Sequence, residues 1–154
     1  MRAATHVLWR INNEYRKRLS QAQTLLNLLE QVLVMQRDYR EEHTLAALAY
    51  VRDQLEVIAE EHRLWRHHFY YESLDTRRMV QDDRAVHQAL SRFSRMRAHQ
   101  ERRLHDIYTL LDGLPRPQAS ITSIPNGDLW TMAQDAVAEL VTFDNFLNEV
   151  SEAS

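Results

Sequence analysis

Apolar residues recur every three or four positions along four stretches of the chain, a spacing that places them on one face of an α-helix. They predict helices at about residues 5–37, 39–72, 75–111 and 128–150, with a loop over residues 112–127. The stripe of the first helix consists of Leu8, Ile11, Tyr15, Leu19, Ala22, Leu25, Leu26, Leu29, Val32 and Leu33. Spacings of three and four sum to seven, which is typical of helices packed at shallow angles. The pattern therefore predicts an all-α, antiparallel up-and-down helical bundle with three long helices and a shorter fourth helix.

The first two turns of this bundle are built without glycine or proline. Asp38 and Glu41 form a capping-box pattern between the first and second helices, and one continuous helix through this point is the alternative. Ser73 or Asp75 can cap the third helix, while Asp82–Asp83 is a competing start signal. The sequence therefore predicts two alternative starts for the third helix within residues 73–83.

The third helix is expected to end near Gly113, because glycine suits a helix C-cap and Pro115 prevents continuation. Asp128 can cap the fourth helix. At 1.5 Å per residue, each of the first three helices is about 50 Å long and the fourth about 36 Å. We therefore expect the fourth helix to stop short of the end at which the first helix begins.

Glycine and proline are scarce, since the two glycines and three prolines of the chain all lie between residues 113 and 127. A β-fold needs turn residues along its whole length, and a nucleotide-binding α/β fold needs glycines after its strands, so both are excluded. The absence of cysteine excludes disulfide frameworks and thiolate chemistry. No apolar run approaches the ~18 residues of a membrane span. We expect one cytoplasmic domain over residues 1–154 that has no membrane partner.

Charge is divided unevenly along the chain. Residues 1–105 carry 18 basic and 14 acidic groups, whereas residues 106–154 carry one basic and eight acidic groups, for net charges of +4 and −7. Arg97 and Gln100 interrupt the apolar stripe of the third helix. A buried arginine without a partner costs several kcal/mol, so we expect Arg97 to pair with a carboxylate of the fourth helix; an anion-binding pocket is the alternative. The available carboxylates are Asp135, Glu139 and Asp144.

A second apolar line lies on the second helix, roughly 150° from its core stripe. Its members recur every seven residues and are Tyr50, Val57, Leu64 and Tyr71. A helix with two apolar faces normally has two partners. We therefore predict that the chain self-associates through this line as a homo-oligomer; the alternative is scattered exposed apolar residues, which are common.

The third helix also presents a basic strip within about 100° of arc. The strip consists of Arg92, Arg95, His99, Arg102 and Arg103. It is expected to face solvent, where it can bind phosphates or an acidic protein partner. The aromatic interleaving of single-strand binders is missing, because Phe93 belongs to the core stripe.

Nucleic acid is an alternative partner of this strip. Arg92 and His99 have a spacing that is similar to the Arg-x₄₋₆-His catalytic pair of HEPN-type ribonucleases. Arg63 and His68 show the same spacing, which arises by chance in a chain with so many arginines and eight histidines. The spacing therefore assigns no family, and nucleic-acid binding or cleavage is not the favoured function.

Histidines and aromatic residues gather at the end that the fourth helix is expected to leave uncovered. The candidates for a ligand pocket there are His6, Trp9, Trp65, His68 and Phe69. Such rings can hold a flat aromatic ligand. The favoured interpretation is that they cover the open end of the core.

A metal site in the middle of the bundle is a further alternative. Counting back through the turns places His62 beside Tyr15 and His87, and Asp83 shares a helix face with His87. Two histidines and a carboxylate suit Zn or non-haem Fe. No glutamate precedes a histidine by three residues, as ferritin-like di-iron bundles require. A buried histidine bonded to Tyr15 or a carboxylate is favoured, and no cofactor is expected.

No Ser/His/Asp order, phosphate loop or His-Glu-x-x-His pattern is present. The sequence therefore favours a non-enzymatic protein-interaction or adaptor bundle that self-associates through the second helix. One alternative is a small-molecule or metal-binding bundle that uses the His/aromatic end. The other is a nucleic-acid-binding or ribonuclease-like bundle that uses the basic strip.

Overall fold

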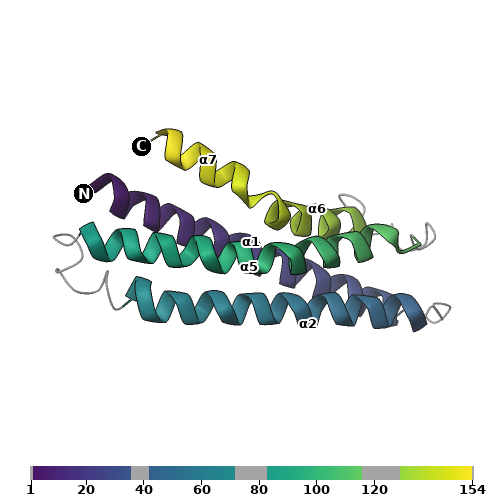
Figure 1. The fold of residues 1–154 in the computed structure, drawn as a ribbon. Helices are drawn as coiled ribbons and strands as arrows, with labels where there is room; N and C mark the ends of the chain where they lie inside the picture. Colours follow the sequence, from purple (N-terminus) through teal and green to yellow (C-terminus); the bar gives the residue numbers. More distant parts are fainter. Residues whose placement is uncertain (1, 36–41, 72–82, 116–128, 154) are drawn as a thin grey trace.

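A computed structural model of the chain describes residues 2–35, 42–71, 83–115 and 129–153 (Figure 1). Its elements are α1 (Arg2–Met35), α2 (Glu42–Trp65), the π-helical turn η1 (Arg66–Tyr71), α5 (Asp83–Gly113), α6 (Leu129–Val141) and α7 (Phe143–Ala153). No strand occurs in these ranges. The prediction of an all-α fold is therefore confirmed.

The central element is α1, which contacts α2, α5, α6 and α7. In Figure 1, α1 runs from the N-terminus at the left toward the right, and α2 returns to the left. The chain then runs to the right again in α5 and leads back through α6 and α7. Both α2 and α6 contact α5 as well as α1, so α1 and α5 separate α2 from the C-terminal helices.

The predicted stripes meet in one core. On α1 the buried members are Leu8, Ile11, Tyr15, Leu19, Ala22, Leu26, Leu29 and Leu33. Leu25 and Val32, at the margin of the stripe, are partly buried. Burying one large apolar side chain stabilises the fold by about 1.5–3 kcal/mol, so these stripes hold the helices together. The polar residues His62, Arg97 and Gln100 are buried with them.

The second predicted helix changes geometry before residue 72. Its α-helical part ends at Trp65, and the chain continues in the wider turn of η1. Short π-helical turns of this kind insert a bulge into a helix. The capping residues expected at the other boundaries fall outside the described residues; they are Asp38, Glu41, Ser73, Asp75, Asp82 and Asp128.

The predicted fourth helix is divided into two. Thr142 separates α6 from α7, and its amide and hydroxyl both donate to the carbonyl of Ala138 at 2.9 Å. The amide of Asn145 donates to the carbonyl of Thr142 at 3.0 Å, which is a tighter, three-residue spacing. Threonine hydroxyls that bond back to the preceding turn commonly bend helices, and here the helix is interrupted.

After this interruption, α7 leans on the N-terminal half of α1. Phe146 lies under the guanidinium of Arg10, with 5.7 Å between Cζ and the ring centroid, and Val150 is buried. In Figure 1 the C-terminus lies beside the beginning of α1. The fourth segment therefore runs along the N-terminal half of α1 toward the end that it was expected to leave uncovered.

Replacing Gly113 by alanine is expected to raise the free energy of unfolding by about 0.4–1 kcal/mol, because alanine restricts the unfolded chain more than glycine does. A Cβ at this position would meet no atom within 4 Å, so the folded state loses nothing. Urea denaturation of the wild-type protein and G113A measures the difference. A lower value for the variant would show that the end of α5 requires glycine.

Candidate functional site

A chain of hydrogen bonds leads from the middle of the core to the surface. The hydroxyl of Tyr15 donates to Oε1 of Gln100 at 2.5 Å, and Nε2 of Gln100 donates to Oε1 of Glu61 at 3.4 Å. The same Glu61 oxygen accepts from Arg103 at 2.9 Å. Tyr15 and Gln100 are fully buried, whereas Glu61 and Arg103 are half-buried. Because each bond requires its partner in place, this chain fixes the register of α1, α2 and α5.

The Tyr15 hydroxyl stays protonated in this setting. Burial raises the pKa of Tyr15 well above its ordinary value, and the positive charge of Arg97 opposes this effect only in part. The carboxylates of Glu61 and Asp144 add to the increase in the pKa. Tyr15 is therefore a fixed hydrogen-bond donor and has no acid–base role near neutral pH.

His62 lies beside Tyr15, as the sequence predicts, but the contact joins ring to ring. The His62 ring meets the edge of Tyr15 at 5.2 Å and stacks on Trp65 at 5.6 Å between centroids. Burial lowers the pKa of His62 to about 3, with smaller contributions from Arg66 and Arg16. Its Nε2 has no hydrogen-bond partner among the described residues. His62 is thus a neutral aromatic member of the core.

The other residues proposed as metal ligands do not complete a site in the described part of the chain. His87 is exposed on α5, while His62 is buried, and the side chain of Asp83 is not described. Within the described ranges, no group of three or more His, Asp or Glu residues is arranged to hold a metal ion. The surroundings of His62 are those of a packed ring.

The His/aromatic end is divided between core and surface. Trp65 is buried, and its Nε1 donates to the carbonyl of Ala89 at 3.0 Å. His6, Trp9 and His68 are exposed, whereas the side chain of Phe69 is not described. Because Trp65 is packed against other core rings, it covers the core, as the favoured interpretation expects, and does not line an open pocket.

Arg97 is buried as predicted, but it binds main chain rather than a carboxylate. Its Nη2 donates to the carbonyls of Leu140 and Val141 at 2.8 and 2.9 Å. In an unbroken helix these carbonyls would accept from the amides four residues later, so Arg97 stabilises the end of α6 where the helix is interrupted. The expected pairing with a carboxylate of the fourth helix is therefore wrong. The carboxylates in question are all exposed: Asp135, Glu139 and Asp144.

A second arginine secures the same junction from α1. Nη1 of Arg18 donates to the carbonyl of Glu139 at 3.3 Å. Its guanidinium also lies over the rings of Phe143 and Phe146, at 5.2 and 5.3 Å from Cζ to the centroids. Cation–π contacts of this kind contribute about 0.5–2 kcal/mol each. Arginines of α1 and α5 thus bind α6 and α7 through backbone carbonyls and aromatic rings.

The basic strip lies on the outside of α5, where the sequence predicts it. Arg92, Arg95, His99 and Arg102 are exposed, and Arg103 is half-buried through its ion pair with Glu61. A shallow groove of about 260 Å³ joins the strip to α2. The residues that line this groove are Tyr50, Gln54, His99, Arg102, Arg103 and Asp106. The strip and one end of the second apolar line are therefore neighbours, a relation that the sequence alone does not reveal.

Three residues of the second apolar line are exposed on one face of α2, and we call them the α2 line. Tyr50 is 51% exposed, Val57 42% and Leu64 45%. The side chain of Tyr71, the fourth predicted member, is not described. Since the core face of α2 buries Leu55 and Ile58 completely, the α2 line is a separate apolar surface.

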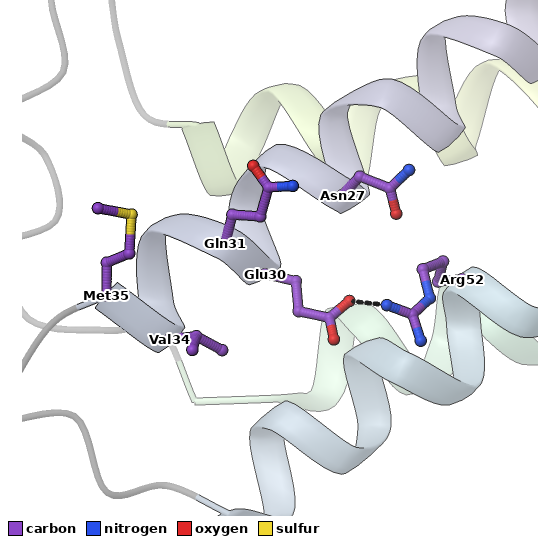
Figure 2. Close-up of a pocket in the computed structure, with 6 residues that line it drawn as sticks. All are labelled: Asn27, Glu30, Gln31, Val34, Met35 and Arg52. Atoms are coloured by element: carbon purple, nitrogen blue, oxygen red, sulfur yellow. Dashed lines mark hydrogen bonds and ion pairs between the residues drawn. The ribbon is translucent and has the colours of Figure 1, made fainter.

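A further groove between α1 and α2 was not predicted (Figure 2). It has a volume of about 300 Å³ and is lined by Asn27, Glu30, Gln31, Val34, Met35 and Arg52. Figure 2 shows Glu30 facing Arg52, with 2.7 Å between carboxylate and guanidinium. Val34 and Met35 are 63% and 81% exposed. Their position outside the α1 stripe is the signal that could have identified this surface.

Comparisons of the chain with protein-family models, with curated proteins and with solved structures found no match. In the described ranges, every helix lacks the apolar length needed to traverse a membrane. A functional proposal for this chain therefore depends on its surfaces and internal contacts.

His62 makes the folded state sensitive to acid. The unfolded histidine takes up a proton near pH 6.5, whereas the folded one does so only near pH 3. Its contribution to the free energy of unfolding is complete above pH 6.5 and is lost as pH falls toward 3, at up to about 1.4 kcal/mol per pH unit. We expect H62L to show a flatter decline than the wild-type protein in urea denaturation at successive pH values. The exposed-site control H87L should keep the wild-type slope, and equal slopes for H62L and the wild type would contradict the assignment.

Removing the Arg97 guanidinium is expected to lower the free energy of unfolding by about 1–3 kcal/mol, because one buried and one part-buried carbonyl lose a charged donor. We also expect faster hydrogen exchange of the α7 amides in R97M. The control is R95M, since Arg95 is exposed on the same helix and its loss should change neither measurement. An R97M protein of wild-type stability would show that α6 and α7 can merge and satisfy these carbonyls themselves.

Proposed function

We propose that the chain is an antiparallel up-and-down helical bundle that acts as a non-enzymatic protein-interaction module and self-associates through α2. The observation that carries this proposal is the α2 line. Its three large apolar side chains recur at seven-residue intervals, and each leaves between two and three fifths of its surface exposed. A seven-residue interval returns to nearly the same direction on a helix, so the three residues are aligned along one face of α2.

The fold itself does not require this surface. The core side of α2 already supplies buried contacts to α1 and α5. An apolar line directed away from that core gains stability only when another surface removes it from water, at about 25 cal/mol per Å² buried. Exposed apolar residues that gather on one face of a helix mark interaction sites more often than scattered ones do.

Polar contacts also join α2 to both of its neighbouring helices. On α2, Glu61 is bonded by Gln100 and Arg103 of α5, and Arg52 is paired with Glu30 of α1 at 2.7 Å. These contacts fix α2 from both neighbouring helices. A preformed surface loses little conformational entropy when it binds, which supports a docking role.

Placing charged side chains on the α2 line tests the proposal. We expect the wild-type protein to dimerise in size-exclusion chromatography with light scattering, and V57E/L64E to be monomeric across a series extending to high micromolar concentration. An interface cannot bury glutamates without a large desolvation penalty. The matched control is L28E, because Leu28 on α1 is 44% exposed and should leave the dimer intact.

Circular dichroism and thermal melting establish that both variants remain folded, as exposed positions should allow. A wild-type protein that stays monomeric at high micromolar concentration would overturn the proposal. So would a dimer that L28E disrupts and V57E/L64E does not.

A further inference from the structure

We infer that the partner seated on the α2 line is a second copy of this chain whose α2 runs in the same direction, across a two-fold axis parallel to the helix. This inference rests on the proposed self-association and adds the geometry of the pair. It follows from the different charges on the two sides of the α2 line.

One side of the α2 line adjoins the basic strip. The groove that contains Tyr50 also contains Arg102 and Asp106 of α5. Glu61 lies on this side of α2, where it is paired with Arg103 at 2.9 Å. The four arginines of the strip outnumber these two carboxylates, so this side carries a net positive charge.

The other side of the α2 line carries carboxylates. Asp53 and Glu60 are exposed, and at 100° per residue they lie about 40–60° around the helix from the line, away from α5. Arg63 is bonded to Glu60 at 2.6 Å, and Arg52 to Glu30 at 2.7 Å. Carboxylates outnumber the two arginines here, so this side carries a net negative charge.

A two-fold axis determines which sides meet. When the axis runs parallel to α2, the two helices are parallel, and the negative side of each copy faces the positive side of the other. When the axis lies in the interface and perpendicular to α2, the helices are antiparallel and each side faces its own copy. Like charges opposed across an interface cost free energy, whereas opposite charges favour association. The charge distribution therefore selects the parallel pair.

The parallel pair also sets the apolar contacts. Each residue of the α2 line meets its own counterpart, so Tyr50 lies against Tyr50 of the second copy, and Val57 and Leu64 do likewise. Tyrosine rings can pack edge to face while their hydroxyls remain in water. In the antiparallel pair, Tyr50 would instead face Leu64, and Val57 alone would meet its own counterpart.

Cysteine cross-linking reads the direction of the pair, because the chain has no cysteine of its own. The single variants Y50C, V57C and L64C are oxidised in the full-length protein, with L28C as the surface control. A disulfide requires Cα atoms within about 7 Å. We expect all three α2 variants to form disulfide-linked dimers faster than L28C.

The antiparallel arrangement predicts a different pattern. Its two copies of residue 50 would lie about 21 Å apart, at 1.5 Å per residue over fourteen residues. Only V57C would then link to itself, and a mixture of Y50C and L64C would link to each other. That pattern would overturn the parallel arrangement.

Neutralising the negative side of the α2 line tests the direction of the pair a second time, through the dissociation constant and without a cross-link. In the parallel pair, D53N/E60Q removes attraction, so the dissociation constant is expected to rise about two- to fivefold at low salt. In the antiparallel pair, the same change removes repulsion and the dissociation constant would fall. The control E101Q removes an exposed carboxylate on the other flank of α5 and should leave the dissociation constant unchanged.

Light scattering separates this inference from the proposed function. A wild-type monomer at high micromolar concentration overturns both. A dimer that V57E/L64E disrupts, but that cross-links in the antiparallel pattern or tightens in D53N/E60Q, overturns the parallel arrangement alone. Cross-linking of L28C as fast as the α2 variants would show that the α2 line is not the interface.

Discussion

The bonds from Arg97 to the end of α6 are the contact on which the C-terminal half of the structure depends. A buried guanidinium needs acceptors, and the interruption at Thr142 provides two carbonyls that an unbroken helix would keep for itself. The interruption also allows α7 to turn toward α1, where Phe143 and Phe146 meet Arg18. The buried charge and the broken helix therefore support each other. Without the break, Arg97 would lack these acceptors, and without Arg97, the carbonyls of Leu140 and Val141 would lose its guanidinium as a donor.

The polar residues of the core work together with this contact. The hydrogen bonds from Tyr15 to Gln100 and onward to Glu61 fix the axial register of α1, α2 and α5. Apolar stripes of similar spacing alone would allow several registers. His62 fills the space beside Tyr15 as a neutral ring. This chain of hydrogen bonds ends at the ion pair of Arg103 with Glu61. The register of the core therefore also fixes the position of the basic strip relative to the α2 line.

The sequence predicts the all-α class, the buried stripes and the exposure of both surface lines, because these follow from helical periodicity alone. It also identifies Arg97 as buried. The predicted carboxylate partner of Arg97 is wrong, because an apolar stripe implies a continuous helix whose backbone carbonyls are already bonded within it. The groove that joins Tyr50 to His99 and Arg102 could not be predicted either. It depends on the rotation of α5 relative to α2, which the hydrogen bonds of Gln100 and Arg103 to Glu61 fix.

In the part of the chain that the structure describes, the basic and acidic parts are not joined by ion pairs between Arg97 or Arg18 and the carboxylates of α6 and α7. The arginines that hold α6 and α7 use carbonyls and aromatic rings, so carboxylates such as Asp135, Glu139 and Asp144 stay exposed. In Figure 1 the two C-terminal helices lie on the side of α1 and α5 that is opposite to α2. A pair joined along α2 would therefore keep its basic strips near the interface and present an acidic face at each outer side. In such a pair, the exposed carboxylates of Asp135, Glu139 and Asp144 would repel those of other pairs, which would favour a closed pair over further assembly.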